Sequence, residues 1–462
     1  MIQQIGNATL HLGDCLDVLR AFADNSVDSI VTDPPYGLSF MGKKWDYDVP
    51  SEAIWAELLR VLKPGGHLLA FAGTRTQHRM ACRIEDAGFE IRDMIAWVYG
   101  SGFPKSLDVS KAIDKAAGVG REIGVAGPYS ARRPRDSVDA VSAYHDGVGD
   151  AGSALITNPA TEAAKQWQGW GTALKPSLEP ITMARKPFAC TVAANVLQHG
   201  TGALNIDASR VGYAGTEDAA AAAAAAAIDL RGRQIASPTG FLAAKKPQKL
   251  DLTEYLDGPA GAGRWPANLI HDGSAEVLAV FPITSSGLMT AGTVREAQDE
   301  PGSVCYGTYG GNATSVNTPG DAGSAARFFY CAKASAEDRN EGMHSFAAQQ
   351  QDPTRKAGDP GGDNPRNRGA QARQNHHPTV KPTDLMRYLL RLVTPPHGVA
   401  LDPFLGSGST GKAAMLEDLR FIGIERDPAY FAIACARLEH SIAQGSLFAP
   451  VASSTEQAEA AA

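Results

Sequence analysis

A short apolar segment that ends in Asp-Pro-Pro-Tyr constrains the fold of this chain most strongly. Residues 27–32 are mostly apolar or β-branched and are followed at once by a turn sequence, so they predict a buried strand. Pro34 and Pro35 cannot donate to a strand ladder, and Pro34 restricts Asp33 to an extended conformation. Asp33, the Pro34 carbonyl and the Tyr36 ring should therefore form a stiff platform at a strand's carboxyl end. Open α/β sheets bind ligands there, and this platform suits a flat heterocycle that carries an exocyclic amino group.

Strands and helices alternate regularly on both sides of this platform in the sequence. The first 110 residues predict strands at 9–12, 67–72 and 91–98, helices at 15–23, after Ser51 and at 75–87, and a turn at 63–66. After residue 380 the pattern predicts a helix at 384–393, strands at 399–401 and 421–424, and helices after the Gly-rich turn and after Asp427. Such alternation with short connections predicts an α/β fold with a doubly wound, mostly parallel sheet.

The middle of the chain differs in composition from the two ends. Residues 111–375 are rich in Gly, Pro, Ala and polar side chains, and they contain a run of alanines at 219–227. Two local basic clusters, at 132–135 and 245–246, lie in this segment. We therefore expect one half of an α/β domain at 1–110, a large insertion with flexible segments at 111–375, and the other half at 376–445. The Ala-, Ser- and Glu-rich tail at 446–462 is expected to be disordered.

Composition excludes several classes of protein. The net charge of −7 does not indicate nucleic-acid binding, so any surface that binds DNA must come from local basic clusters. The six cysteines are scattered and form no Cys-x-x-Cys pair, which argues against a zinc site and fits a reducing cytosol. No apolar run approaches the ~20 residues of a membrane helix, and the N-terminus lacks a signal pattern. We expect a cytoplasmic protein with no metal site.

A second motif follows the predicted strand at 399–401. Residues 406–411 match G-x-G-x-x-G, and Glu425 lies about where a ribose-binding acid is expected. With Lys412 the same residues nearly match a phosphate-binding P-loop, but position 413 is alanine and the Mg²⁺-binding Ser or Thr is missing. This spacing leaves three ligands open: a nucleoside triphosphate, a dinucleotide and S-adenosylmethionine (AdoMet).

Four carboxylates favour the third ligand. Asp14, Asp33, Asp402 and Glu425 all fall at the carboxyl ends of predicted strands, which places them along one edge of the sheet. Such an edge would repel a polyphosphate, and a dinucleotide site needs only one such acid. The arrangement suits a ligand that has ribose hydroxyls, an amino group and a sulfonium cation, which is AdoMet.

The motifs resemble those of a known family. Asp-Pro-Pro-Tyr at 33–36 resembles the catalytic motif of the DNA amino-methyltransferases, which methylate adenine N6 or cytosine N4 with AdoMet. Residues 402–410 resemble the family's AdoMet-binding motif, and residues 377–382 resemble the segment just before it. The segments 97–104 and 327–333 resemble family segments that flank an insertion. A catalytic motif placed before the cofactor motif is the circularly permuted order of the beta group, in which the insertion is the target recognition region.

The resemblance implies a role for each motif residue. The catalytic set is Asp33, Pro34, Pro35 and Tyr36. The implied cofactor-binding set is Asp14, Lys381, Asp402, Phe404, Gly406, Ser407, Gly408 and Glu425. Within it, Glu425 would bind the ribose hydroxyls, and Asp14 would accept from the cofactor's adenine amino group.

The implied activity is transfer of a methyl group from AdoMet to adenine N6 of a base flipped out of double-stranded DNA. The choice of adenine over cytosine comes from the family, because cytosine-N4 members more often begin this motif with Ser, whereas this chain begins it with Asp33. Cytosine N4 remains the nearest alternative, and a dinucleotide-dependent oxidoreductase is a more remote one that would leave the Asp-Pro-Pro-Tyr motif unexplained. Besides DNA, the partners that the resemblance suggests are a cognate restriction endonuclease and a second copy of the chain.

Overall fold

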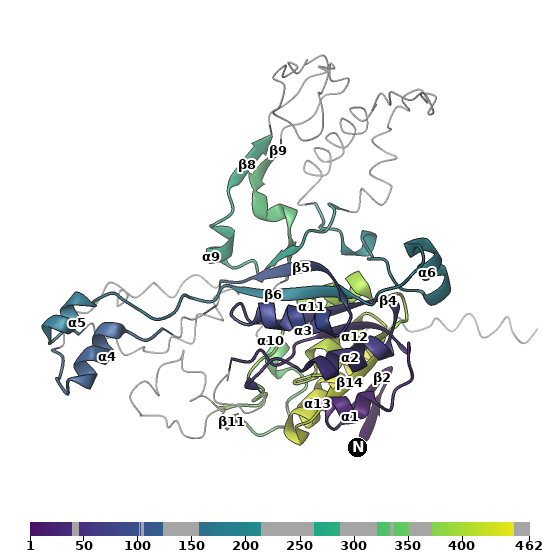
Figure 1. Cartoon of the computed structure of the whole chain (residues 1–462), viewed down its shortest axis with the longest axis horizontal. Helices are drawn as coiled ribbons and strands as arrows, with labels where there is room; N and C mark the ends of the chain where they lie inside the picture. The colour runs from purple at the N-terminus through teal and green to yellow at the C-terminus, as the bar shows by residue number, and fades with distance from the viewer. Residues whose placement is uncertain are drawn as a thin grey trace, which may run out of the picture. The chain divides into compact units, whose positions relative to one another are not determined.

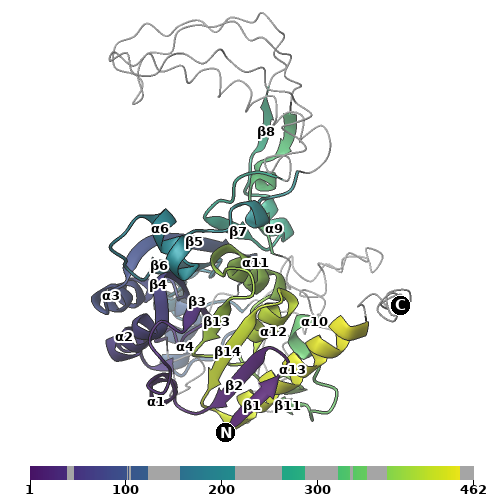
Figure 2. The same cartoon turned by 90° about the vertical axis from the view of Figure 1, so that its right-hand side faces the viewer.

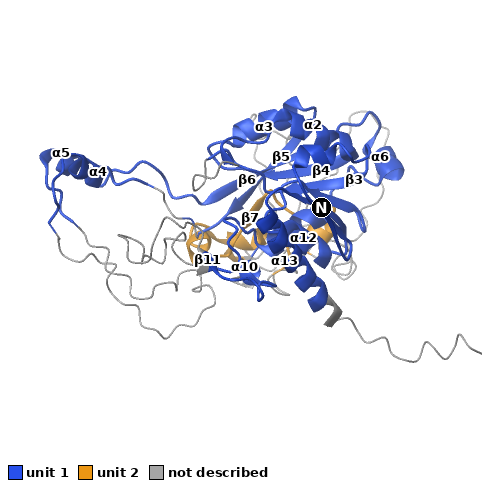
Figure 3. Ribbon diagram, turned by 90° about the horizontal axis from the view of Figure 1, so that it is seen from below, with its two compact units in different colours: residues 1–204, 332–462 blue, residues 205–331 orange. Residues whose placement is uncertain are grey.

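The computed structural model describes residues 1–38, 46–100, 102, 106–122, 157–213, 263–286, 321–332, 337–350 and 372–447. The chain divides into two compact units, one of residues 1–204 and 332–462 and one of residues 205–331 (Figure 3). The alanine run, both basic clusters, the tail beyond 447 and parts of the segments 97–104 and 327–333 lie outside the described residues. Across the ranges just given, no helix is long and apolar enough to span a membrane.

A mostly parallel sheet forms the centre of the first unit (Figures 1 and 2). Its strands lie in the order β1 (Ile2–Ile5), β2 (Ala8–Leu12), β14 (Arg420–Glu425), β13 (Val399–Asp402), β3 (Val27–Thr32), β4 (Leu62–Phe71), β6 (Leu178–Arg185) and β5 (Glu90–Val98). Strands β2, β14, β13, β3 and β4 pair in parallel, while β1 and β6 run antiparallel to their neighbours. The predicted α/β fold class is confirmed, and the circular permutation stays a prediction.

Strand β3 lies in the middle of this sheet, and all six of its residues are buried. Ile30 pairs with Leu401 of β13 on one side and with Leu68 of β4 on the other. Burial on both faces suits the apolar side chains of β3, and its buried polar residues have partners: Asp28 pairs with Lys63, and Ser29 bonds to Thr394. The pairing also brings together the two motif-bearing strands, although the ends of β3 and β13 are 370 positions apart in the sequence.

Helices cover both faces of the sheet, as Figure 2 shows. On one side lie α1 (Cys15–Leu19), α2 (Glu52–Val61) and α3 (Gln77–Asp86), and on the other lie α11 (Thr383–Val393), α12 (Ser409–Leu416) and α13 (Pro428–Leu447). Trp55 and Leu58 of α2 pack with Met80 and Ile84 of α3 into a buried cluster that includes Ile30 of β3. The amphipathic spacing of these helices thus buries their apolar stripes against the sheet.

Two features of the sheet differ from the sequence expectation. Strand β4 begins at Leu62 rather than after a turn at 63–66, because tertiary contacts hold that segment: Lys63 pairs with Asp28, and the Pro64 carbonyl accepts from Asn195. Strand β6 lies between β4 and β5, although it falls within the segment 111–375 that the composition assigned to an insertion. The residues on either side of β6 are rich in Gly and Pro, so the sequence pattern did not indicate this antiparallel strand between β4 and β5. The first unit therefore extends to residue 204 before the chain enters the second.

The remaining elements are short. In the first unit they are α4 (Val109–Ala116), α5 (Glu162–Gln166), α6 (Val192–His199), α10 (Glu337–Asn340), β11 (Gln349–Gln350) and β12 (Ala372–Arg373). In the second unit they are η5 (Asp207–Ser209), β7 (Leu269–His271), α9 (Ala275–Leu278), β8 (Ile283–Ser286), β9 (Asp321–Ser324), η7 (Ala325–Phe328) and β10 (Tyr330–Cys331). There β7 pairs with β10 in parallel, and β8 pairs with β9 antiparallel. The role of the segment 111–375 in target recognition stays a prediction.

Candidate active site

Four acidic residues gather at one edge of the sheet because of its strand order. Strands β2, β14, β13 and β3 are adjacent and parallel, so their carboxyl ends meet at the same edge. Asp14 and Asp33 lie just past β2 and β3, and Asp402 and Glu425 are the last residues of β13 and β14. The environments of the four carboxylates nevertheless differ, and so do the contacts that they make.

Asp33 lies in a compact polar cluster with Tyr36, Lys381 and Glu179, which we call the Asp33 cluster. The Tyr36 hydroxyl donates to Asp33 Oδ1 at 2.7 Å, and Lys381 Nζ lies 2.9 Å from Asp33 Oδ2. Glu179 Oε2 lies 3.1 Å from the Tyr36 hydroxyl and 3.0 Å from Lys381 Nζ. Lys381 Nζ is also 3.1 Å from the Tyr36 oxygen. One ammonium and one phenol thus bridge two carboxylates.

The charges in the Asp33 cluster fix the protonation of its two donors. Burial alone would lower the pKa of Lys381, but the charges of Asp33 and Glu179 and the hydrogen bonds to them outweigh burial and raise this pKa. Burial, followed by the same two carboxylates, raises the pKa of Tyr36 well above its ordinary value. Lys381 therefore stays an ammonium and Tyr36 stays a neutral hydroxyl around neutral pH.

The backbone of the platform is held by a buried carboxylate that the sequence analysis did not single out. Asp46 Oδ1 accepts the backbone N–H groups of Tyr36 at 2.7 Å and Gly37 at 2.9 Å, and its Oδ2 accepts that of Leu38 at 3.3 Å. Pro34 is buried and Pro35 is half-buried in the irregular segment that links β3 to Tyr36. The platform is therefore fixed at both ends, by β3 and by Asp46.

Asp402 joins the platform to residues 403–408, which connect β13 to α12 and which we call the Gly-rich loop. Its Oδ1 accepts from the hydroxyl of Thr32 at 2.6 Å and from the backbone N–H of Phe404 at 3.1 Å, and its Oδ2 accepts from the hydroxyl of Thr410 at 2.6 Å. Asp402 is only 1% exposed, and burial raises its pKa to about 6 although these hydrogen bonds oppose the shift. These contacts lie within the fold, so the cofactor contact implied for Asp402 stays a prediction. Phe404 itself packs against the main apolar cluster.

Glu425 supports the Gly-rich loop from the neighbouring strand. Its Oε2 accepts the backbone N–H of Gly406 at 2.8 Å, and its Oε1 accepts that of Asp427 at 2.7 Å. Burial raises the pKa of Glu425 to about 7, against the opposing effect of these two hydrogen bonds. Asp14 is exposed and caps α1 by accepting from the backbone N–H of Leu16 at 2.9 Å. Both carboxylates thus stay at the edge of the sheet.

Gly406 and Gly408 have backbone conformations that side chains rarely adopt, with φ of +53° and +78°. A Cβ at Gly406 would lie 2.9 Å from His377 Nε2, and a Cβ at Gly408 would lie 3.0 Å from the backbone of Ala434. Burial lowers the pKa of His377 to about 4, so this imidazole is neutral beside the loop. The glycines therefore serve a tight turn between closely packed elements.

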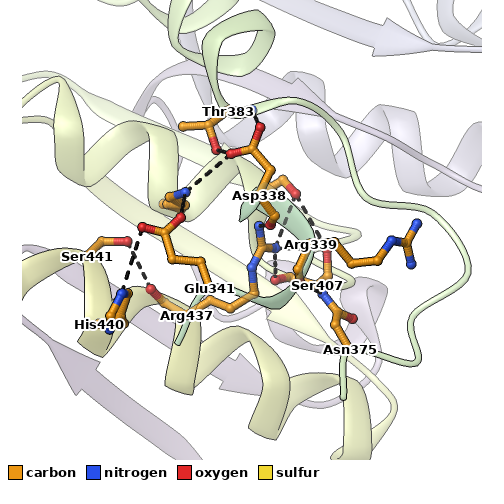
Figure 4. A network of polar contacts seen from close by, with 11 residues as sticks. Asp338, Arg339, Glu341, Asn375, Thr383, Ser407, Arg437, His440 and Ser441 are labelled. Carbon is orange, nitrogen blue, oxygen red and sulfur yellow. Dashed lines mark hydrogen bonds and ion pairs between the residues drawn. The ribbon is translucent and has the colours of Figure 1, made fainter. Parts of the chain in front are cut away.

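A buried polar network holds the other side of the loop (Figure 4). Arg437 Nη1 donates to the Ser407 carbonyl at 2.6 Å and lies 3.1 Å from Ser407 Oγ, while Arg437 Nη2 donates to the Asp338 carbonyl at 2.7 Å. Lys412, the lysine of the near P-loop match, is 6% exposed and pairs with the carboxylates of Asp338 and Glu341. Lys412 is thus committed to a structural ion pair, which argues against a phosphate-binding role.

The structure brings together most of the residues that the sequence analysis selected. Lys381 lies with Asp33 and Tyr36, whereas Asp402 joins that platform to the loop of Gly406, Ser407 and Gly408. Three residues of the site were missed: Asp46, Glu179 and Arg437. Their partners are distant in sequence or depend on loop geometry, and Glu179 lies where the strand pattern is obscured, so no local signal marked them.

Comparison with known proteins agrees with the site. Residues 27–116 and 332–436 match the sequence model of the DNA methylase family. The type II methyltransferase M.HindIII of Haemophilus influenzae is 30% identical over 152 residues, which cover 32% of this chain and 36% of that protein. The putative methylase YubD of Escherichia coli is 50% identical over 50 residues, which cover 11% of this chain and 22% of YubD. The chain thus spans about a third or less of the length of these curated relatives.

Among solved structures, that of the M1.HpyAVI–SAM complex aligns over 93% of this chain and 98% of its own, at 14% identity and a TM-score of 0.35. The two segments matched by the family model contain the Asp33 platform and the Gly-rich loop respectively. Both halves of the candidate site therefore lie in segments that match the DNA methylase family model, which confirms the resemblance inferred from the motifs.

Proposed function

We propose that this chain transfers a methyl group from AdoMet to adenine N6 in double-stranded DNA. One observation carries the proposal: the Asp33 platform and the Gly-rich loop adjoin each other at one edge of the sheet. Asp402 links them directly, because it accepts from Thr32 at the end of β3, from Phe404 in the loop and from Thr410 in the first turn of α12. A methyl donor in the loop and an amine on the platform would then lie side by side.

The residues around the loop fit AdoMet. Glu425 and Asp14 supply carboxylate acceptors at the edge of the sheet, which suit ribose hydroxyls and an adenine amino group. Lys412 is occupied by Asp338 and Glu341, and an edge with several carboxylates would repel a polyphosphate. AdoMet would supply an activated methyl group on a positively charged sulfur.

The platform provides the groups that the amine requires. An exocyclic amine is a weak nucleophile because its lone pair is delocalised into the ring. We assign Asp33 and the Pro34 carbonyl as acceptors of its two N–H bonds, which directs the nitrogen lone pair toward the methyl carbon. When the N–C bond forms, the nitrogen loses one proton, for which Asp33 is the acceptor, and the electron pair of the broken S–C bond stays on sulfur. Alignment of this kind contributes several kcal/mol in enzymes, and preorganised acceptors stabilise the developing charge.

The base must leave the duplex to reach Asp33, because its amino group lies inside the stack. We assign the Tyr36 ring as a stacking surface for the flipped base, for which stacking is worth ~1–3 kcal/mol. The choice of adenine rests on the Asp that begins the motif, and cytosine N4 is the alternative product. Target recognition by the segment 111–375, pairing with a restriction endonuclease and dimerisation are further parts of the proposal.

Nucleoside analysis tests the proposed reaction. Duplex DNA of mixed sequence is incubated with the protein and isotope-labelled AdoMet, digested to nucleosides and analysed by mass spectrometry. We expect labelled N6-methyladenine with the wild-type protein and less than about 1% of that amount with Asp33→Ala, since loss of a charged acceptor and of alignment exceeds roughly 2.7 kcal/mol. Labelled N4-methylcytosine alone would refute the choice of base, and no labelled nucleoside at all would refute the reaction.

A further inference from the structure

Both carboxylate oxygens of Asp33 already have strong partners in this structure. Oδ1 accepts from the Tyr36 hydroxyl at 2.7 Å, and Oδ2 faces Lys381 Nζ at 2.9 Å. An ammonium at this distance withdraws electron density from the carboxylate and makes it a weaker acceptor for an amine N–H. Each carboxylate oxygen can accept more than one hydrogen bond, but Asp33 becomes a stronger acceptor for the target amine if these donors have another acceptor.

Glu179 offers that acceptor to both donors at once. Its Oε2 lies 3.0 Å from Lys381 Nζ and 3.1 Å from the Tyr36 hydroxyl, so the same two donors stand between two carboxylates. The Lys381 side chain is 7% exposed, compared with 19% for Asp33 and 21% for Glu179, so water competes little for its ammonium. A small shift of either donor exchanges one carboxylate for the other, and the buried ammonium of Lys381 stays paired throughout.

The position of Glu179 follows from the topology of the sheet. Strand β6 runs antiparallel to β4 and β5, so its first residues lie where the parallel strands end. Glu179 pairs in register with Trp97 near the end of β5, and the Pro180 carbonyl accepts from the N–H of Ala72 just past β4. Burial and the charge of Glu179 raise the pKa of Tyr99. The Tyr99 side chain is therefore a second phenol close to this carboxylate. The antiparallel strand therefore delivers one acid to an edge otherwise built from parallel strands.

We propose that Glu179 is a positioning residue that takes over Lys381 and the Tyr36 hydroxyl when Asp33 binds the target amine. This inference rests on the proposed methyl transfer at the same site. The Asp33 cluster contains two carboxylates and one ammonium, so one negative charge is in excess. With Lys381 held by Glu179, that excess charge resides on Asp33. Asp33 can then accept a hydrogen bond from the amine and, later, the proton that the nitrogen loses.

Glu179→Gln separates this role from a structural one. Gln keeps the shape and can still accept from Tyr36, but it cannot balance the charge of Lys381, which would then stay on Asp33. We expect the single-turnover rate of methyl transfer to fall about tenfold or more, because a charge-assisted partner is lost. AdoMet and DNA dissociation constants should change less than about threefold, because no assigned ligand contact is removed. Glu179→Asp, which keeps the charge, should recover part of the rate.

The pH–rate profile supplies a readout that a packing defect would not move. Glu179→Gln removes one of the two negative charges that face Lys381, so the acid limb of the pH–rate profile should shift to lower pH while the plateau falls. Glu90→Gln is the matched control, because Glu90 is a carboxylate at the other end of the β5–β6 pair, where it binds Arg185 at 2.7 Å. We expect its rate and profile to equal those of the wild type.

The outcomes separate this inference from the proposed reaction. An active wild type whose rate and acid limb are unchanged in Glu179→Gln would overturn the role of Glu179 alone. A loss of rate that follows weaker AdoMet binding or unfolding, and is equal in Gln and Asp variants, would also overturn it. A wild type that methylates neither adenine nor cytosine would overturn both.

Discussion

Asp402 offers a quantitative test of how the two halves of the site are joined. The residue is 1% exposed, and its carboxylate accepts from two hydroxyls, those of Thr32 and Thr410, and from the N–H of Phe404. Asn in its place would resemble the protonated acid: its carbonyl can accept from Thr32 and Phe404, and its NH₂ can donate to the Thr410 oxygen, because a hydroxyl both donates and accepts. We therefore expect Asp402→Asn to preserve the link and most of the methyl transfer.

The pKa of Asp402 gives the magnitude and the sign. Burial raises it from 3.8 to about 6, so the folded protein binds a proton between these values that the unfolded chain has lost. Stability from this group is therefore greatest below pH 4 and falls as the pH rises through 6. The charged form costs the folded state about 3 kcal/mol at pH 8 and about half of that at pH 5, at 1.36 kcal/mol for each unit of pKa. Asp402→Asn removes this cost and should be the more stable protein at pH 8.

Urea denaturation followed by circular dichroism, at pH 5 and pH 8, measures the effect. The difference in unfolding free energy between Asp402→Asn and wild type should be positive and should grow with pH by roughly 1–2 kcal/mol. Asp402→Ala is the contrasting variant, because it leaves three donors without their acceptor at ~1–3 kcal/mol each and should destabilise the protein at both pH values. The reasoning is refuted if Asn destabilises the protein as much as Ala, or if the difference does not change with pH.

Three further predictions concern the Gly-rich loop. AdoMet affinity should rise about tenfold from pH 6 to pH 8, because the pKa of Glu425 is about 7 and its carboxylate is the proposed acceptor. Calorimetry should show that the affinity of Glu425→Gln does not change with pH, and a wild-type affinity that does not change with pH would contradict the role of Glu425. Arg437→Met should weaken AdoMet binding and lower the melting temperature, because the donors to Ser407 are lost; unchanged affinity would show that the loop does not need them. Gly406→Ala should cost about 1 kcal/mol or more of stability from its positive φ and its approach to His377, and a thermal melt equal to wild type would refute this.

Much of the first unit could be predicted from the sequence. The α/β class, the buried strand at 27–32 and the helices that open after Asp14 and Asp427 follow from local patterns, because burial and capping impose them residue by residue. The two motifs also marked Asp33 and the Gly-rich loop directly. The sequence prediction failed where a tertiary contact outweighed local preference. In β4, the ion pair between Lys63 and Asp28 extends the strand through residues that resemble a turn.

The sequence by itself determined which chemical groups stand at the ends of which strands. Only the tertiary structure decided how those groups are used, because pairing β13 with β3 and inserting β6 beside β4 are long-range events that no local pattern encodes. Those events turned Asp402 into a buried link between two motifs and brought Glu179 to Lys381. A carboxylate's role depends on burial and on its partners, and both are fixed only when distant segments meet.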